Sequence, residues 1–232
     1  MCGRYTLANP DPKRLRLRFD LDESMQISEQ PRFNIAPTDP VLAVRSDPET
    51  AKRGIGALRW GLLPGHWAVE RKGPPLINAR AETIETQPAF REAFAERRCL
   101  IPADGFYEWR RDEKGKVPIW LSRPDHELFA FAGIWAEYRP REGGEATHSC
   151  AIVTCSPNRM MAAIHDRMPV VLDRGAEAAW LDPATQPEDL EQLLVPAAED
   201  VLEPREVEDL VNNVREDGPA LIEPRREPDT LF

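Results

Sequence analysis

Prolines divide this chain into short segments. The 232 residues include 23 prolines and 13 glycines. Because each proline fixes φ and removes a backbone donor, such a chain forms short elements joined by stiff turns. The sequence predicts many strands with interspersed helices. We therefore expect an α+β fold, a single β-rich domain whose sheets pack as a sandwich or a barrel-like core with peripheral helices.

Apolar patterning gives the expected elements. Strands are expected over residues 3–7, 41–44, 55–60, 99–101, 106–109, 119–122, 128–138 and 149–155. Helices are expected over residues 11–19, from Thr86-Gln87-Pro88 through a stripe of Ala89, Phe90, Ala93 and Phe94, and over 158–164, 176–180 and 189–194. No repeat or linker separates domains, so residues 1–232 are expected to form one domain. The acidic segment from Pro204 is expected to end in a loose, proline-rich tail from about residue 224.

The charge of the chain limits its partners. The formal net charge is −10 at pH 7, which argues against coating nucleic acid through bulk electrostatics. Residues 1–115 carry 19 Lys and Arg against 17 Asp and Glu, whereas residues 116–232 carry 11 against 23. An anionic ligand is therefore expected to meet local arginines, most of them in the first half.

The sequence shows no targeting segment. No apolar run approaches the roughly 18 residues of a membrane span, and the N-terminal residues lack an apolar signal region. We expect a soluble, cytoplasmic monomer without a membrane partner.

Three of the four cysteines are expected to be buried free thiols. Cys99, Cys150 and Cys155 lie in apolar runs, and none of the four cysteines is in CxxC spacing. In one strand, Cys150 and Cys155 would point to opposite faces and could not pair. The sequence predicts no metal site and no cofactor.

The remaining cysteine, Cys2, offers unusual chemistry. Removal of Met1 leaves a 1,2-aminothiol, with an amine of pKa about 8 beside a thiol of pKa about 8.5. The amine can condense with an aldehyde to an imine, and the thiolate can then close a five-membered thiazolidine. Taken alone, a cysteine at position 2 is usually incidental.

Seven ordered blocks place Cys2 in context. They are Cys2-Gly3-Arg4-Tyr5, Phe33-Asn34-Ile35-Ala36-Pro37-Thr38, Trp60-Gly61-Leu62-Leu63-Pro64, Ile77-Asn78-Ala79-Arg80-Ala81-Glu82-Thr83, Arg98-Cys99-Leu100-Ile101-Pro102-Ala103-Asp104-Gly105-Phe106-Tyr107-Glu108-Trp109, His165-Asp166-Arg167-Met168-Pro169-Val170-Val171-Leu172 and Val211-Asn212-Asn213-Val214. With these blocks the chain resembles the SOS response-associated peptidase (SRAP) family from residue 2 to about 224.

The resemblance implies a sensor of abasic sites in single-stranded DNA that crosslinks itself to the lesion through the processed N-terminal cysteine. It places the reactive centre at Cys2, Asn78, Glu108 and His165. It also credits the same cysteine with removing its own leading residue.

The residue types suit these roles. An abasic sugar is mostly a closed hemiacetal, so a proton must move before the aldehyde appears. Glu108 is the expected general acid/base, with its pKa raised by burial among Phe106, Tyr107 and Trp109. His165 suits proton transfer near neutral pH, and Asn78 is expected to orient the amine or a sugar oxygen. Residues of these three types also commonly serve only as surface carboxylates, hydrogen-bonded histidines or turn formers.

A second set of residues is expected to contact DNA. Arg80 follows Asn78 by two residues and would share its side of an extended segment, where it could hold a phosphate. Arg4 stands in the same relation to Cys2. The resemblance adds Asn34, and an apolar wedge or stacking platform is predicted from Pro40, Trp60, Leu62 and Trp67. Exposed arginines also commonly form surface ion pairs, and tryptophans more often lie in the core.

One segment departs from the family pattern. Glu206-Val207-Glu208 stands where family members carry Pro-Val-Ser, and its two carboxylates make a DNA contact there doubtful.

Three other functions compete with the crosslinker. The first is an N-terminal-nucleophile peptidase acting on other proteins. The second is a non-covalent reader of modified DNA bases, which leaves the Met-Cys start unexplained. The third is a scaffold without chemistry.

Overall fold

The computed structural model describes residues 2–47, 49–66, 74–113, 115–140 and 143–226. Five strands close a barrel: β3 (Pro40–Ser46), β4 (Arg53–Trp60), β6 (Arg98–Ala103), β9 (Phe129–Tyr138) and β10 (Thr147–Cys155). The strands pair in the order β10-β4-β3-β6-β9, and β9 pairs back to β10, which closes the ring. The β4–β10 pair is parallel and the other four are antiparallel. Closure removes the exposed edges of the sheet.

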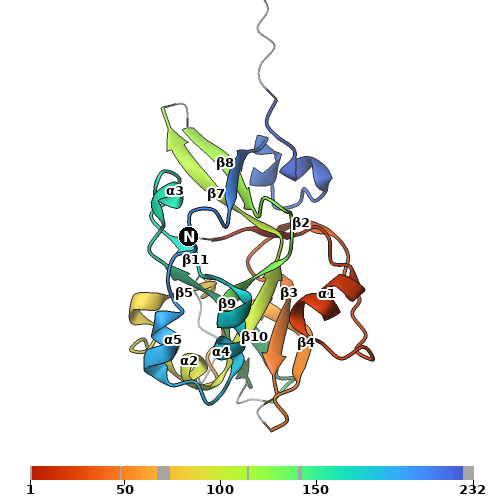
Figure 1. The fold of residues 1–232 in the computed structure, drawn as a ribbon, viewed down its shortest axis with the longest axis vertical. Helices are drawn as coiled ribbons and strands as arrows, with labels where there is room; N and C mark the ends of the chain where they lie inside the picture. Colours follow the sequence, from red (N-terminus) through yellow and green to blue (C-terminus); the bar gives the residue numbers. More distant parts are fainter. Residues whose placement is uncertain (1, 48, 67–73, 114, 141–142, 227–232) are drawn as a thin grey trace, which may run out of the picture.

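A second sheet lies against one end of the barrel (Figure 1). Its order is β13 (Glu203–Glu206), β8 (Gly115–Ser122), β7 (Gly105–Asp112), β1 (Tyr5–Leu7) and β2 (Arg32–Ile35). The expected sandwich or barrel-like core is therefore present as a small barrel with an additional sheet.

Short elements complete the fold. Three short strands extend the barrel sheet: β5 (Asn78–Arg80), β11 (Met168–Pro169) and β12 (Val171–Leu172). The α-helices are α1 (Pro12–Phe19), α2 (Arg91–Glu96), α3 (Arg159–Ala162), α4 (Arg174–Leu181) and α5 (Pro187–Gln192), and the 3₁₀ turns are η1 (Ala81–Thr83), η2 (Asp209–Asn212) and η3 (Pro219–Ile222). Among the described residues, no helix is long and apolar enough to cross a membrane.

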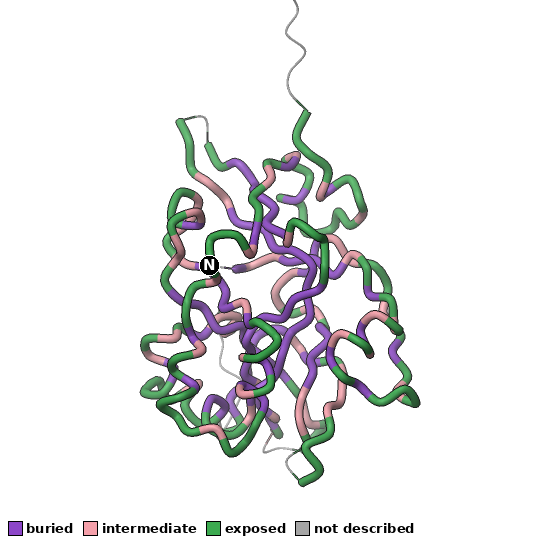
Figure 2. The backbone as a smooth tube through the Cα atoms, in the orientation of Figure 1, coloured by how far each residue is buried: buried purple, intermediate pink, exposed green. Residues whose placement is uncertain are grey.

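The core is continuous between the barrel and the second sheet (Figure 2). Tyr5 of β1 packs edge-on against Trp60 and Phe131 of the barrel, with ring centroids 5.4 and 5.7 Å apart. Phe106 of β7 also contacts Phe131, at 5.9 Å. Burial of these aromatic rings joins the two sheets into one body.

Most predicted elements are confirmed, with shifts at their ends. The helix predicted from Asp11 begins at Pro12, because the Asp11 side chain caps it by accepting a hydrogen bond from the Arg14 amide at 2.8 Å. The helix predicted from Pro88 begins only at Arg91. Strands β2 and β13 were not predicted: β2 alternates polar and apolar residues over only four positions, and β13 has a polar sequence without an apolar alternation.

The acidic C-terminal segment is more ordered than expected up to residue 226. Strand β13 pairs with β8 along its length, and Val207 forms a bridge with Pro224. The tail predicted to be loose from about residue 224 falls mostly on residues 227–232, which lie outside the described residues.

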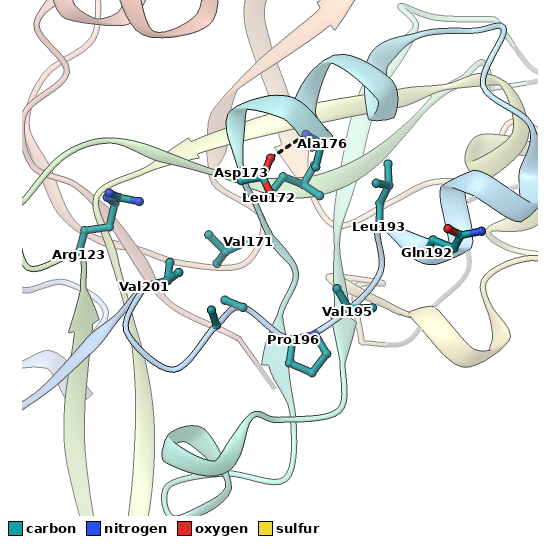
Figure 3. A pocket seen from close by; sticks show the side chains of 12 residues that line it. Arg123, Val171, Leu172, Asp173, Ala176, Gln192, Leu193, Val195, Pro196 and Val201 are labelled. Carbon is teal, nitrogen blue, oxygen red and sulfur yellow. Dashed lines mark hydrogen bonds between the residues drawn. The ribbon is translucent and has the colours of Figure 1, made fainter.

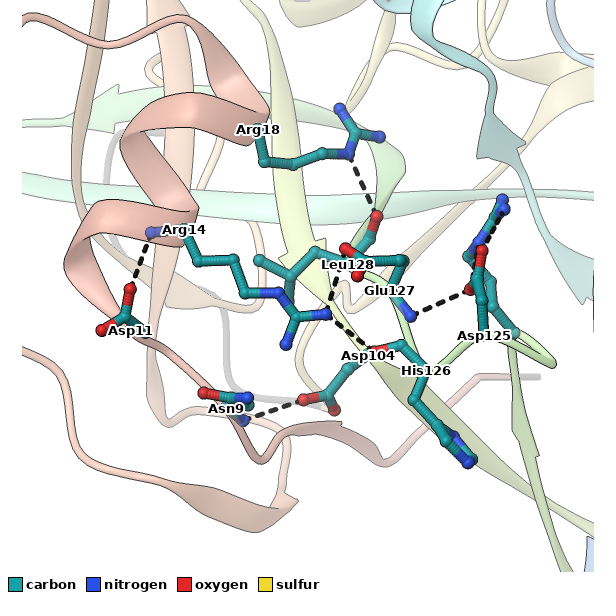
Figure 4. A network of polar contacts seen from close by, with 10 residues as sticks. Asn9, Asp11, Arg14, Arg18, Asp104, Asp125, His126, Glu127 and Leu128 are labelled. Carbon is teal, nitrogen blue, oxygen red and sulfur yellow. Dashed lines mark hydrogen bonds and ion pairs between the residues drawn. The ribbon is translucent and has the colours of Figure 1, made fainter.

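Helix α1 is fixed by two ion pairs that differ in burial. Arg18 donates two hydrogen bonds, of 2.8 and 2.5 Å, to the carboxylate of Glu177 in α4. The Arg18 and Glu177 side chains are 8% and 2% exposed. Arg18 also donates to the Leu128 carbonyl at 3.0 Å (Figure 4). Arg14 pairs with Glu127 at 3.0 Å, but Glu127 is half exposed. The first pair is part of the core, whereas the second lies in solvent.

We predict that Glu177→Ala destabilises the protein by about 3–5 kcal/mol, because it leaves the Arg18 charge buried without its partner. The matched control Glu127→Ala should cost less than about 1 kcal/mol, since an exposed pair is screened. Urea unfolding of both variants measures the difference. Equal losses would contradict the assignment of the Arg18 pair to the core.

Candidate active site

The four residues predicted for the reactive centre come from four separate segments and meet beside the N-terminus. Cys2 precedes β1, Asn78 opens β5, Glu108 lies in β7, and His165 lies in the loop between α3 and β11. Asn78 Nδ2 donates to the Cys2 carbonyl at 3.0 Å, and His165 Nε2 lies 3.9 Å from Glu108 Oε2. Figure 1 shows the N-terminus beside β7, β11 and β5. These contacts are consistent with the prediction that the four residues lie close together.

Strand pairing produces this convergence. Strand β10 pairs with β5 on one side, with Ile152 opposite Asn78, and with β11 on the other, just after His165. In the second sheet, Tyr5 of β1 lies opposite Phe106 of β7, and the Tyr107 amide donates to the Arg4 carbonyl at 3.0 Å. The barrel therefore supplies Asn78 and His165, and the second sheet supplies Cys2 and Glu108.

Cys2 and Glu108 are both buried, at 0% and 2% exposure. Burial, reinforced by the nearby Glu108 charge, raises the pKa of the Cys2 thiol well above its ordinary value. Burial also raises the pKa of Glu108 above 4.5, with the charge of His165 acting in the opposite direction. The pKa of a free 1,2-aminothiol therefore does not describe the buried Cys2 thiol, whose thiolate form burial disfavours. A base must take the thiol proton, and Glu108 is the adjacent carboxyl group.

Arg4 is held beside this centre by neutral acceptors. Its Nη1 donates to Asn34 Oδ1 at 2.6 Å and to the Val211 carbonyl at 2.8 Å. Its guanidinium carbon lies 6.0 Å from the centroid of the Trp109 ring, within range of a cation–π contact. The side chain is therefore fixed without an ion pair to these partners.

Asn34 has a different role from the one expected. It is 5% exposed, and its Nδ2 donates to the carbonyls of Asn213 and Glu216 at 3.0 and 2.8 Å. Both the oxygen and the nitrogen of its side-chain amide are engaged in hydrogen bonds within the protein. The prediction that Asn34 contacts DNA directly is therefore wrong. Asn34 anchors Arg4 and the segment that follows Val211. The Val-Asn-Asn block was visible in the sequence, but its role required the fold.

A groove with a volume of about 500 Å³ opens beside Gly3 and Arg4. It is lined by Gly3, Arg4, Ala36, Pro37, Thr38, Asp39, Trp109 and Val214. Trp109 Nε1 donates to Asn212 Oδ1 at 2.7 Å, which fixes the indole ring at the wall. Trp109 was expected only to bury Glu108. The alternation of β7 was the missed signal, since consecutive strand residues point to opposite faces.

The other predicted DNA contacts have mixed outcomes. Arg80 is exposed and lies in the same short strand as Asn78, and Pro40 is exposed at the start of β3. Trp60 is completely buried and donates its Nε1 to the Ile77 carbonyl at 3.0 Å. The prediction that Trp60 stacks on a base is therefore wrong, as is the same prediction for Leu62, which is 1% exposed. Trp67 lies outside the described residues.

The carboxylates of the departing segment are engaged within the protein. Glu206 forms an ion pair with Arg110, and Glu208 Oε1 accepts a hydrogen bond from the Arg226 amide at 2.9 Å. The charge of Glu206 is therefore partly compensated by Arg110.

A second cavity and three further cysteines lie away from this centre. A cavity of about 270 Å³ between the segment after α5 and β12 is lined mainly by apolar side chains, including Val171, Leu193 and Val201 (Figure 3). Cys99, Cys150 and Cys155 are buried free thiols, as predicted. Among the described residues, no group of three or more His, Cys, Asp or Glu is arranged to hold a metal ion.

Comparisons with known proteins agree with these features. The family model of the SOS response associated peptidase (SRAP) matches residues 1–214. A Bacillus subtilis (strain 168) protein named abasic site processing protein YoqW is 41% identical over 227 residues, which cover 96% of this chain and 99% of that protein. The Escherichia coli (strain K12) protein named abasic site processing protein YedK is 30% identical over 231 residues, covering 97% of this chain and 100% of its own.

Solved structures share the fold. A Bacteroides thetaiotaomicron protein superposes with a TM-score of 0.85 at 21% identity, covering 97% of this chain and 100% of its own. A Bordetella bronchiseptica protein gives a TM-score of 0.75 at 28% identity, covering 89% and 100%. The β-rich domain predicted from the sequence is thus the fold of these proteins.

We predict that Asn34→Ala lowers the free energy of unfolding by about 1–3 kcal/mol, because buried carbonyls and the Arg4 guanidinium lose their partner. Asn9→Ala is the control, since Asn9 is exposed and its backbone amide, which donates to Asp104, is retained. Urea unfolding compares the two. A loss for Asn34→Ala no larger than for Asn9→Ala would remove Asn34 as an anchor.

Proposed function

Because the chain belongs to the SOS response-associated peptidase family, we propose that it processes abasic sites in single-stranded DNA by bonding covalently to them through Cys2. The observation that carries this proposal is the approach of Asn78 to the buried Cys2 and of His165 to the buried Glu108, whose charge lies close to the Cys2 thiol. The names of the relatives, abasic site processing proteins, support the substrate.

The chemistry follows from the residues present. Removal of Met1 gives Cys2 a free α-amine, which attacks the aldehyde carbon of the opened sugar. Loss of one water gives the imine. The Cys2 sulfur then adds to the imine carbon, the nitrogen gains a proton, and a thiazolidine is formed.

Proton transfer is the part that the fold must supply. The raised pKa of the Cys2 thiol means that its proton must be accepted before sulfur attacks. In its ionised form, Glu108 accepts this proton, and in its protonated form it assists opening of the hemiacetal and departure of water. His165, whose Nε2 faces Glu108, passes protons between the carboxyl group and solvent.

The DNA strand is proposed to follow the groove that Arg4 and Trp109 line. Arg4 and the Trp109 ring combine positive charge with an aromatic face, the combination that binds single strands through phosphate and base stacking. Arg80, exposed two residues beyond Asn78, suits a phosphate next to the reacting sugar.

The word peptidase in the family description supports a second activity, which we propose is removal of Met1 by Cys2 itself. The intact mass of freshly made wild-type and Glu108→Gln protein, produced without an aminopeptidase, tests this activity. Retention of Met1 in the wild type would exclude it and leave the crosslinking proposal intact.

We predict that wild-type protein lacking Met1 forms a heat-stable adduct with a single-stranded oligonucleotide that carries one abasic site. The adduct should have the mass of protein plus DNA minus one water on intact-mass analysis, and undamaged DNA should give none. Cys2→Ala should give no adduct, and Cys2→Ser only an imine that borohydride traps. Full activity of Cys2→Ala would exclude the mechanism and favour a non-covalent reader.

We predict that Glu108→Gln slows adduct formation at least about tenfold and removes one proton from its pH dependence. Burial raises the pKa of Glu108, so the basic form is lost as pH falls through a value above 4.5. At low pH the wild-type rate should therefore decrease with the uptake of two protons, one by the α-amine and one by Glu108. The rate of the variant should decrease with protonation of the amine only. Single-turnover rates between pH 4.5 and 9 measure this. Identical profiles would exclude Glu108 from proton transfer.

A further inference from the structure

We propose that Glu82 is a positioning residue that holds Arg167 and, through it, orients the His165 imidazole toward Glu108. This inference rests on the proposed function and assigns a role to a carboxylate that does not itself reach the reacting atoms. It concerns the loop that follows α3 and the turn η1 that follows β5.

Glu82 and Arg167 form a two-pronged ion pair. Arg167 Nη1 and Nη2 lie 2.6 and 2.9 Å from the two carboxylate oxygens of Glu82. Such parallel hydrogen bonds fix direction as well as distance. The Arg167 hydrogen bond lowers the pKa of Glu82, so the carboxylate stays ionised at neutral pH. The pair therefore ties the turn after Asn78 and Arg80 to the loop that carries His165.

A third contact fixes the guanidinium against the barrel. Arg167 Nη2 donates to the Thr154 carbonyl of β10 at 2.7 Å, and the Arg167 side chain is only 12% exposed. Thr154 lies opposite both Arg80 of β5 and Pro169 of β11. Because Glu82 and the Thr154 carbonyl both hold the guanidinium, the Arg167 backbone has little freedom to move.

The backbone of Arg167 touches the His165 ring. The Arg167 amide donates to His165 Nδ1 at 3.1 Å. A ring nitrogen that accepts a hydrogen bond carries no proton in neutral imidazole, so the proton resides on Nε2. This is the nitrogen that lies 3.9 Å from Glu108 Oε2. The position of Arg167 thus selects the tautomer that can donate toward Glu108.

A neighbouring carboxylate favours the opposite tautomer. Asp166 Oδ1 lies 2.8 Å from His165 Nδ1, which would suit a proton on that nitrogen. The Asp166 side chain is 87% exposed, however, so solvent screens this contact and its side chain can turn away. The amide of Arg167 cannot turn away while Glu82 and Thr154 hold its side chain. The two contacts compete, and the pair with Glu82 decides in favour of the amide.

The test combines a spectroscopic and a kinetic measurement on protein lacking Met1. The ¹⁵N shifts of histidine-labelled, DNA-free protein report the tautomer of His165, identified by the signal that is lost in His165→Gln. In Glu82→Gln, and in Arg167→Lys, which keeps the charge but loses the fork, we expect a smaller Nε2–H population. The maximal single-turnover rate at saturating abasic single strand should fall about tenfold, with less than a twofold change in half-saturating concentration.

Two further variants sharpen the result. Glu82→Asp keeps a carboxylate and should recover part of the rate. Glu96→Gln removes the same charge from an exposed pair with Arg97 and should match the wild type. Unchanged ¹⁵N shifts and rate in Glu82→Gln would overturn the proposal. Tighter DNA binding at an unchanged rate would also overturn it, because Glu82 would then merely compete with a phosphate for Arg167. If the wild type forms no adduct, the proposed function fails, while the ¹⁵N measurement still decides whether Glu82 orients His165.

Discussion

The packing of Tyr5 between the two sheets fixes the place of Cys2, the proposed nucleophile. Its ring is buried against Trp60 and Phe131 of the barrel, while its backbone pairs with β2 and β7 of the second sheet. A chain terminus is ordinarily mobile unless such contacts tie it down. Because Cys2 precedes Tyr5 by only three residues, the joint between the sheets also brings Cys2 to the barrel residue Asn78. The proposed reactive centre therefore lies where both halves of the fold meet.

Burial at this joint also controls reactivity. A thiolate, rather than a thiol, is the species that attacks and oxidises. Since burial raises the pKa of Cys2, its sulfur stays protonated until a base accepts the proton. The raised pKa of Glu108 makes that carboxyl group a better match for the thiol than an exposed glutamate. Burial therefore lowers the thiolate population of Cys2 and also suits Glu108 to its proposed role as the base.

The sequence predicted what depends on local pattern and missed what depends on tertiary contact. Apolar runs identified the barrel strands, whereas β13, with the polar sequence Glu203–Glu206, is a strand only because β8 offers its edge. The proposed reactive residues were predicted from a family resemblance, and their approach to one another is a property of strand pairing. Trp60 was misassigned because the sequence alone does not distinguish a tryptophan in the core from one on the surface. Asn34 was misassigned because its partners lie about 180 residues away.

The hydrogen-bond acceptors that hold Arg4 make an acidic chain compatible with a DNA substrate. Arg4 is held by the amide oxygen of Asn34 and the carbonyl of Val211, which orient the guanidinium without cancelling its charge. Asp39, the carboxylate that lines the same groove, lies 2.5 Å from Arg32 and is compensated there. A phosphate entering the groove thus meets an oriented positive charge despite a net charge of −10. Arg167 differs from Arg4 because its partner is the carboxylate of Glu82. Arg167 is therefore suited to orienting the neighbouring His165 rather than to attracting an anion.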